Sequence, residues 1–196
     1  VMLLEPSENG LVRHEVRAEC GVNSHIHIMT IMIGRGDIYS DDHVTLSGDG
    51  ARFDADAAYL GKNSQTIDYN IVADHFGKKT ESLITVNGAL TDSAKKVFRG
   101  TIDFKKGSAD SVGSENETVL MLGDDVVNKT VPLILCAEEN VEGTHGATIG
   151  ELDADTMFYF ESRGIDRETA EKIMAYAAVE RLIHMAEDSE FAAVAE

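Results

Sequence analysis

The sequence contains no tryptophan, only two cysteines and two prolines, and few basic residues for its length. Lysine and arginine number 17 against 35 aspartates and glutamates, so the 196 residues carry a net charge of −18. A protein that binds nucleic acid or an anionic membrane unaided needs an excess of basic residues to meet the phosphates, which argues against both partners. No apolar run approaches the roughly 18 residues of a membrane-spanning helix, so we expect no membrane segment.

The two cysteines, Cys20 and Cys136, are too far apart in the chain to form a CxxC motif. They make neither a disulfide framework nor a zinc-finger spacing, and they predict a reducing, cytoplasmic setting. The first residues, Val1 to Pro6, lack a basic segment followed by an apolar one, so we expect no signal peptide. They resemble the middle of a chain, and we expect these residues to be part of a longer protein.

Apolar residues alternate with polar ones between about residues 20 and 136, with the period of two that is typical of half-buried β-strands. The segment 25–33 is apolar on nearly both faces, which predicts a strand that is covered on both sides. Hydrophobic residues make up 43% of the chain, which is enough for a packed core. The clearest alternating positions are Ile67, Tyr69 and Ile71; Ile84 and Val86; and Phe98, Gly100, Ile102 and Phe104.

Clusters of Gly, Asn and Asp separate these runs at intervals of roughly 15 to 20 residues, and such clusters predict turns. Among them, the pair Asn87-Gly88 is typical of a tight β-hairpin. No long helical pattern lies between the runs, which leaves an antiparallel sandwich, an antiparallel barrel or a stacked β-solenoid. The residue pattern alone does not choose among these folds, because no strict repeat is visible.

The pattern changes near residue 150, where helical spacing replaces alternation. Asp153 is placed to cap a short helix that Gly164 ends, since glycine readily adopts the left-handed conformation after a helix. Asp166 is placed to cap a longer helix, with Glu168 in its first turn and apolar positions at helical spacing to about Met185.

This change predicts a mainly β fold with a helical end. We expect a β core over residues 1–150 and a C-terminal helical region over residues 151–196. The strongly polar stretch from Glu187 onward predicts a frayed tail after the second helix.

Two histidines suggest a metal-dependent enzyme as one hypothesis. His25 and His27 lie on one face of a predicted strand, and His43 with Asp41–Asp42 could complete a cupin-like site, because neutral imidazole is a good metal ligand. A cupin requires a glutamate a few residues farther on, and residues 31–33 contain none. A cupin or a β-helix that acts on polysaccharide is nevertheless the competing function class.

Other catalytic patterns are absent from the sequence. There is no Gly-x-Ser-x-Gly elbow, and the Gly-Lys pairs at 61–62 and 77–78 lack the earlier glycine of a phosphate loop. Cys136 follows the apolar residues 133–135, so we expect a small core side chain and not a reactive thiolate. The low aromatic content of 6% disfavours carbohydrate binding. These observations disfavour a nucleophilic enzyme.

A combination of motifs in residues 132–164 is specific enough to identify a family. Its parts are His145-Gly146-Ala147-Thr148 with Gly150, then Leu152-Asp153, Phe158-Tyr159 and Ser162-Arg163-Gly164-Ile165. In these residues the chain resembles the SufB/SufD family, the core proteins of the SUF iron–sulfur cluster assembly machinery, and weaker likeness extends over about residues 20 to 187. His-Gly-Ala is typical of SufD, whereas SufB-like sequences tend to have glutamate in place of Gly146.

The resemblance implies a fold and a set of partners. The family fold is a right-handed parallel β-helix (β-solenoid) followed by a C-terminal α-helical pair, which would select the solenoid from the folds left open above. The resemblance also implies pairing through the β-helix with a SufB/SufD-type subunit or a second copy of the chain. A SufC-type ATPase would dock on the C-terminal helices. Such a protein is a component of an assembly scaffold and not an enzyme.

The resemblance further implies a shared, transient iron–sulfur cluster as the cofactor. In SufD-like members the histidine that matches His145 lies near the partner interface, so His145 is the residue we expect to bind metal. Glu117, where SufB-like members have a cysteine, and Cys136 are weaker candidates for binding the cluster. Clusters are usually held by about four thiolates, and family members often have a cysteine at the position of Gly143. The remaining ligands would come from a partner; a third hypothesis is a structural subunit that contributes no ligand.

Overall fold

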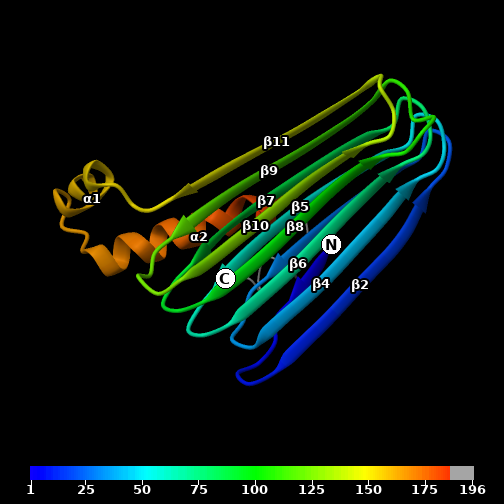
Figure 1. Cartoon of the computed structure of the whole chain (residues 1–196). Coiled ribbons are helices and arrows are strands. Elements are labelled where there is room, and N and C mark those ends of the chain that lie inside the picture. The colour runs from blue at the N-terminus through cyan, green and yellow to red at the C-terminus, as the bar shows by residue number, and fades with distance from the viewer. Residues whose placement is uncertain (186–196) are drawn as a thin grey trace.

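The computed structural model describes residues 1–185, which form β-strands followed by two α-helices (Figure 1). The helices are α1 (Ala154–Glu161) and α2 (Arg167–Met185). The predicted mainly β body with a C-terminal helical pair is therefore confirmed. The strands are β1 (Met2–Leu4), β2 (Leu11–Cys20), β3 (His25–Met32), β4 (Asp37–Leu46), β5 (Arg52–Gly61), β6 (Thr66–His75), β7 (Glu81–Leu90), β8 (Lys95–Phe104), β9 (Ser111–Met121), β10 (Val127–Cys136) and β11 (Val141–Gly150).

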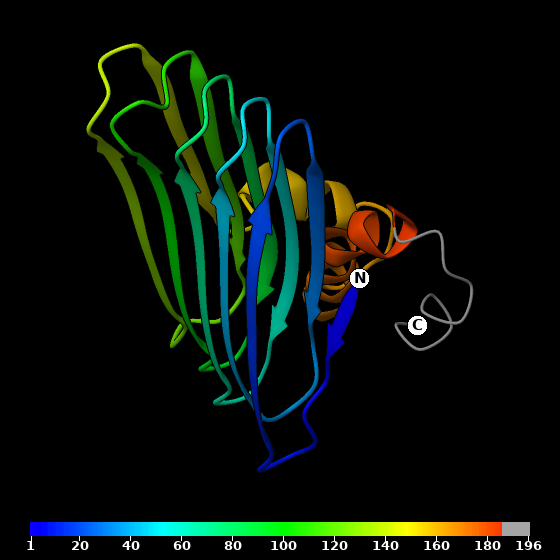
Figure 2. The same cartoon turned by 90° about the vertical axis from the view of Figure 1, so that its right-hand side faces the viewer.

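Successive strands alternate between two parallel sheets, as Figures 1 and 2 show. One sheet has the order β1-β3-β5-β7-β9-β11, and the other has the order β10-β8-β6-β4-β2. Neighbouring strands are in register, so that Arg52 pairs with Glu81, which lies 29 positions later. The chain therefore winds as a β-solenoid in which each coil adds one strand to each sheet. This arrangement excludes the antiparallel sandwich and barrel that the residue pattern left open.

The core occupies the lumen between the two sheets. The alternating residues that the sequence singles out are its inward-facing members: Ile67 and Ile71 of β6 are fully buried, as are Ile84 of β7 and Phe98 of β8. Because the strands are in register, each inward side chain packs on those of the coils before and after it. Burial along a strand therefore alternates, as in β6, where every second residue is buried.

Turns at the corners of the coils use residues with left-handed backbone conformations. Asn63 and Asp92 have φ angles of 54° and 55°, which asparagine and aspartate tolerate better than most residues. The backbone N–H of Asn63 donates to Oδ2 of Asp92 over 2.8 Å, so one corner is tied to the next. Contacts of this kind hold the turns of neighbouring coils in the same register as the strands.

The hairpin predicted at Asn87-Gly88 is wrong. Both residues lie inside β7 and pair with Ala58 and Tyr59 of β5. A Cβ atom at Gly88 would collide with the ring of Tyr59, so this glycine makes room for a large neighbouring side chain instead of forming a turn.

The two C-terminal helices begin and end as their sequences predict. The Asp153 carboxylate accepts a hydrogen bond from the backbone N–H of Thr156, and Asp166 does the same for Thr169. Gly164 has a φ of 77°, the left-handed conformation expected after α1. Neither of these described helices is long and apolar enough to span a bilayer. The tail predicted to fray from Glu187 onward lies outside the described residues.

Helix α2 lies across the outer face of the sheet that contains β3, β5 and β7 (Figure 2). Val179, Leu182 and Ile183 of the helix pack on Met29 and Ile31 of β3. This contact explains why the later half of β3 is apolar on both faces, since Met32 faces the lumen while Ile31 faces the helix. The prediction of a strand covered on both sides is confirmed for this half.

We expect the substitution Leu182→Ala to detach α2 from the solenoid, because the side chain is only 4% exposed and its removal leaves a cavity. The cost should be roughly 2 to 4 kcal/mol. Hydrogen exchange of the α2 amides measures this loss of protection. Ile173→Ala is the matched control, since Ile173 is 43% exposed on the same helix; equal protection in both variants would contradict the packing described here.

Candidate functional site

The solenoid ends in an open coil formed by β10 and β11. These strands lie at the ends of their sheets, and each pairs on one side only, with β8 and β9 respectively, within the described residues. No described coil covers their inward faces, so side chains that would be buried in an earlier coil are exposed here. We call this region the open end of the lumen.

His145 faces into this open end. It registers with Glu115 of β9, which is a buried inward-facing residue, and registered residues in a parallel ladder project in the same direction. Its neighbours on the same face of β11, Gly143 and Ala147, are small. The imidazole is therefore exposed and free to approach a ligand or a partner.

Cys136 also belongs to the open end, which corrects the expectation that it is a core side chain. It registers with Phe104, a fully buried residue of β8, so its direction is inward as the apolar strand pattern suggested. It is exposed because no coil within residues 1–185 covers it. The sequence pattern reported the direction of the side chain correctly but not that β10 belongs to the last coil.

Glu117 lies one coil deeper and is only 2% exposed. Lys96 donates to its Oε1, and the Thr130 hydroxyl donates to its Oε2 over 2.5 Å. Lys96 also lies 3.1 Å from the Thr130 hydroxyl oxygen. Burial lowers the pKa of Lys96, while the neighbouring Glu117 carboxylate opposes that shift. Both carboxylate oxygens of Glu117 thus already have partners inside the protein.

Sequence reasoning missed Glu115, the other buried acid of this region. Burial and the nearby Glu117 carboxylate raise the pKa of Glu115 to about 7. Its Oε2 atom is buried without a hydrogen-bond partner. The sequence did contain a sign of this burial, since Glu115 and Glu117 alternate in step with the apolar Val119 and so lie on the same face of the strand. Only the register of β9 with its neighbours showed that this face points into the lumen.

The structure brings His145 over Glu115 but does not bring all the predicted ligands together. Cys136 lies at the corner where β10 ends, close to the start of β11 at Val141. His145 lies four positions farther along β11, or about 13 Å of strand, so the thiol and the imidazole are apart. No group of three or more potential metal ligands is clustered among residues 1–185. These residues can therefore contribute ligands to a shared site but do not complete one.

The cupin-like site suggested by the histidines is not formed. His25 and His27 stay on the outer face of one sheet, where they contact Asp54 and Asp56 over 2.9 and 2.8 Å. His43 belongs to β4 in the other sheet. The three imidazoles thus do not converge, and the fold is a solenoid and not a cupin barrel.

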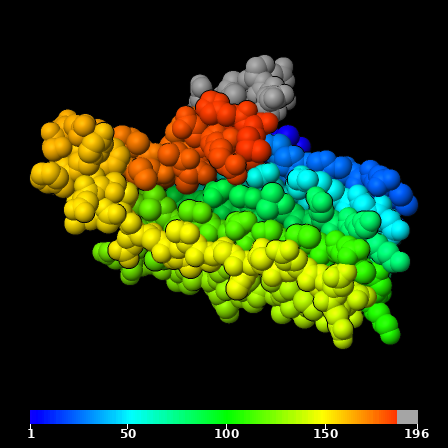
Figure 3. Space-filling view, turned by 90° about the horizontal axis from the view of Figure 1, so that it is seen from above, coloured from blue at the N-terminus to red at the C-terminus, as the bar shows by residue number. Residues whose placement is uncertain are grey.

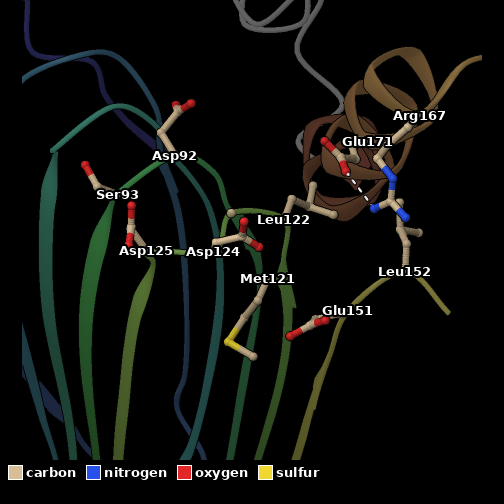
Figure 4. A pocket seen from close by; sticks show the side chains of 11 residues that line it. Asp92, Ser93, Met121, Leu122, Asp124, Asp125, Glu151, Leu152, Arg167 and Glu171 are labelled. Atoms are coloured by element: carbon tan, nitrogen blue, oxygen red, sulfur yellow. Dashed lines mark hydrogen bonds and ion pairs between the residues drawn. The ribbon is translucent and has the colours of Figure 1, made fainter.

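A polar hollow of about 750 Å³ lies between the turns of the later coils and the helices (Figure 4). Five carboxylates line it together with Arg167, which pairs with Glu171. The other four carboxylates belong to Asp92, Asp124, Asp125 and Glu151. Figure 4 shows these side chains spread around the hollow and not pointing at one centre, which suits a solvated acidic surface.

We expect Glu115→Gln to stabilise the protein at pH 8 and to have little effect at pH 4. The folded-state pKa of about 7 lies above the ordinary value of 4.5, so the favourable contribution of this carboxyl is complete below pH 4.5 and is lost as the pH rises through 7. The variant should gain up to about 3 kcal/mol at pH 8. Urea unfolding at both pH values measures the difference, and an equal effect at the two would contradict the raised pKa.

Comparison with known proteins identifies the family of this chain. A family model described as "SUF system FeS cluster assembly, SufBD core domain" matches residues 2–178. The iron–sulfur cluster assembly protein SufD of Bacillus subtilis is 31% identical over 156 residues, which is 80% of this chain and 36% of the relative. SufD of Escherichia coli is 28% identical over 99 residues, or 50% of this chain and 23% of the relative.

A chloroplastic SufBD family protein of Arabidopsis thaliana, ABCI8, is 25% identical over 150 residues, covering 76% of this chain and 27% of the relative. The chain thus spans about a third or less of the length of these relatives. The family suggested by the His145 and Ser162-Arg163-Gly164 motifs is confirmed over nearly the whole described structure. The chain belongs to the SufB/SufD core family of the SUF iron–sulfur cluster assembly system, with greater likeness to SufD.

Proposed function

We propose that this chain is a scaffold subunit on which the SUF system assembles iron–sulfur clusters, and that it is not itself an enzyme. The observation that carries this proposal is the open end of the lumen, where His145 is exposed beside two strands whose outer edges are unpaired within the described residues. Such an end offers both a metal ligand and a surface for a second subunit.

A shared cluster fits the ligands that the open end provides. A cluster usually needs about four ligands, whereas this end carries one imidazole, that of His145, and one thiol, that of Cys136. Neutral imidazole binds iron well, and both side chains are exposed. We assign His145 as the principal ligand, with the remainder supplied by a partner; Cys136, at the corner where β10 ends, is the weaker candidate, and Glu117 is already held by Lys96.

The same end supports pairing with another β-helix. An unpaired strand edge presents backbone donors and acceptors that another strand can meet. The outward-facing residues Val131, Leu133 and Leu135 of β10 are 40 to 45% exposed and form an apolar stripe along this edge. We propose a SufB/SufD-type subunit, or a second copy of this chain, as the partner that covers it.

The first helix supports the proposal that a SufC-type ATPase docks at the C-terminal region. Figure 3 shows α1 projecting beyond the strands, whereas α2 lies on the solenoid. Phe158 and Tyr159 of α1 are 71% and 54% exposed, and the Arg163 guanidinium lies 3.6 Å from the centre of the Tyr159 ring. Exposed aromatic and arginine side chains are frequent anchors in protein interfaces.

We further propose a cytoplasmic location, as for the machinery that the family serves in bacteria. Cys20 and Cys136 are both free thiols, and no disulfide is formed by either. Reduced cysteines are the expected state in that compartment.

We expect His145→Ala to abolish cluster formation while sparing the protein complex, because the imidazole is exposed and supports no packing. The full-length protein would be co-expressed with its ATPase and pairing subunit, purified without oxygen, and its visible cluster absorbance compared with that of the wild type. Iron retention should fall roughly tenfold or more. His25→Ala, on the outer face, is the matched control; normal clusters on His145→Ala would leave only a structural role for the subunit.

We expect Leu133→Lys to weaken pairing, since a charged side chain on a strand edge opposes association with another strand. Light scattering after size-exclusion chromatography should show a shift from the paired to the unpaired species. Leu83→Lys is the control, because Leu83 is also an exposed leucine, at 38%, but belongs to β7 inside its sheet. Pairing that survives Leu133→Lys unchanged would place the interface elsewhere.

A further inference from the structure

Glu115 is a buried carboxyl group for which the folded chain provides no complete set of partners. Its side chain is 2% exposed and its Oε2 atom has no hydrogen-bond partner. Lys96 is close enough to influence Glu115, but its ammonium group is engaged by Glu117 and Thr130. Leaving a carboxylate oxygen unpaired inside a protein is costly, so a purely structural role explains this residue poorly.

The lumen is shaped around this carboxyl group. A Cβ atom at Gly100, on the facing strand β8, would collide with the Glu115 carboxylate. Gly100 registers with Pro132 of the last coil, as Glu115 registers with His145. The carboxylate therefore lies in the layer directly below the open end, in space that a glycine keeps clear.

The register places the imidazole of His145 and the carboxyl group of Glu115 on consecutive coils. Their backbones are about 4.8 Å apart, the spacing between hydrogen-bonded strands, and both side chains project into the lumen. Gly143 and Ala147, on either side of His145 on the same face, leave the imidazole room to turn. The Oε2 atom of Glu115 is the oxygen available to a ligand, since it has no hydrogen-bond partner within residues 1–185.

We propose that His145 and Glu115 together bind a divalent transition-metal ion, Fe(II) in the cell, at the open end of the lumen. Imidazole and carboxylate are the ligand pair that non-haem Fe(II) sites use, with water or a partner's side chains in the other positions. Glu117 lies next to Glu115 on the same face of β9 but is paired with Lys96, which leaves Glu115 as the acid of this face with an oxygen free for a cation. The inference rests on the proposed function and adds a second ligand to it.

Co(II) is a suitable probe, because it adopts similar ligands and its visible absorption reports on coordination. The full-length protein, purified with the subunit that it pairs with, would be titrated with Co(II) by absorbance and calorimetry. We expect Glu115→Gln and His145→Ala each to weaken Co(II) binding roughly tenfold or more. The double variant should bind Co(II) only slightly less tightly than whichever single variant binds it less tightly. Asp124→Asn, which removes an exposed carboxylate lining the polar hollow, should bind as the wild type does.

The outcomes separate this inference from the proposed function. Wild-type Co(II) binding by Glu115→Gln, with loss in His145→Ala, would overturn the role of Glu115 and leave His145 as a cluster ligand. Wild-type binding by both variants would overturn this metal site, and normal cluster assembly on His145→Ala would overturn the proposed function as well. Should Glu115→Gln fail to fold, Glu115→Asp provides the test: its shorter side chain should also weaken binding, and wild-type affinity would contradict the inference.

Discussion

The in-register stacking of parallel strands is the constraint on which the rest of this structure depends. Each inward side chain is covered by the equivalent side chain of the next coil, so a coil buries its inward face fully only when it has neighbours on both sides. Ile38 and Ile67 meet this condition in two adjacent inner coils and are fully buried. The coil of β10 and β11 has a neighbour on one side only in the described part of the chain, and its inward face is exposed for that reason.

The exposed coil presents side chains that an inner coil would bury. Residues that would be inert inside a solenoid, such as His145 and Cys136, become accessible, while the layer beneath them holds an unusual concentration of charge. The Lys96–Glu117 pair is 1% exposed on each side chain, and such pairs cost desolvation energy that geometry must offset. The solenoid thus keeps charged groups in the layer directly beneath its open end.

Much of the fold could be predicted from the sequence, because alternation, helix caps and family motifs are local. Three kinds of feature were predicted correctly: which alternate residues of β6 are buried, the helix caps Asp153 and Asp166, and the family. The hairpin at Asn87-Gly88 and the burial of Cys136 were not. Both errors have one cause: a local pattern does not report what lies on the neighbouring coil, which is a large ring beside Gly88 and solvent beside Cys136.

By itself, the sequence determined where the helices begin, which histidine belongs to the family motif and, on clearly alternating strands such as β6, which residues face inward. These features follow from capping, motif and period. Only the tertiary structure decided which inward residues meet. Glu115 and His145 are 30 positions apart, as are Thr144 and Ser114 on the same pair of strands, and nothing in either segment names the other. Their proximity follows from the length of a coil, which is set by how all the coils pack together.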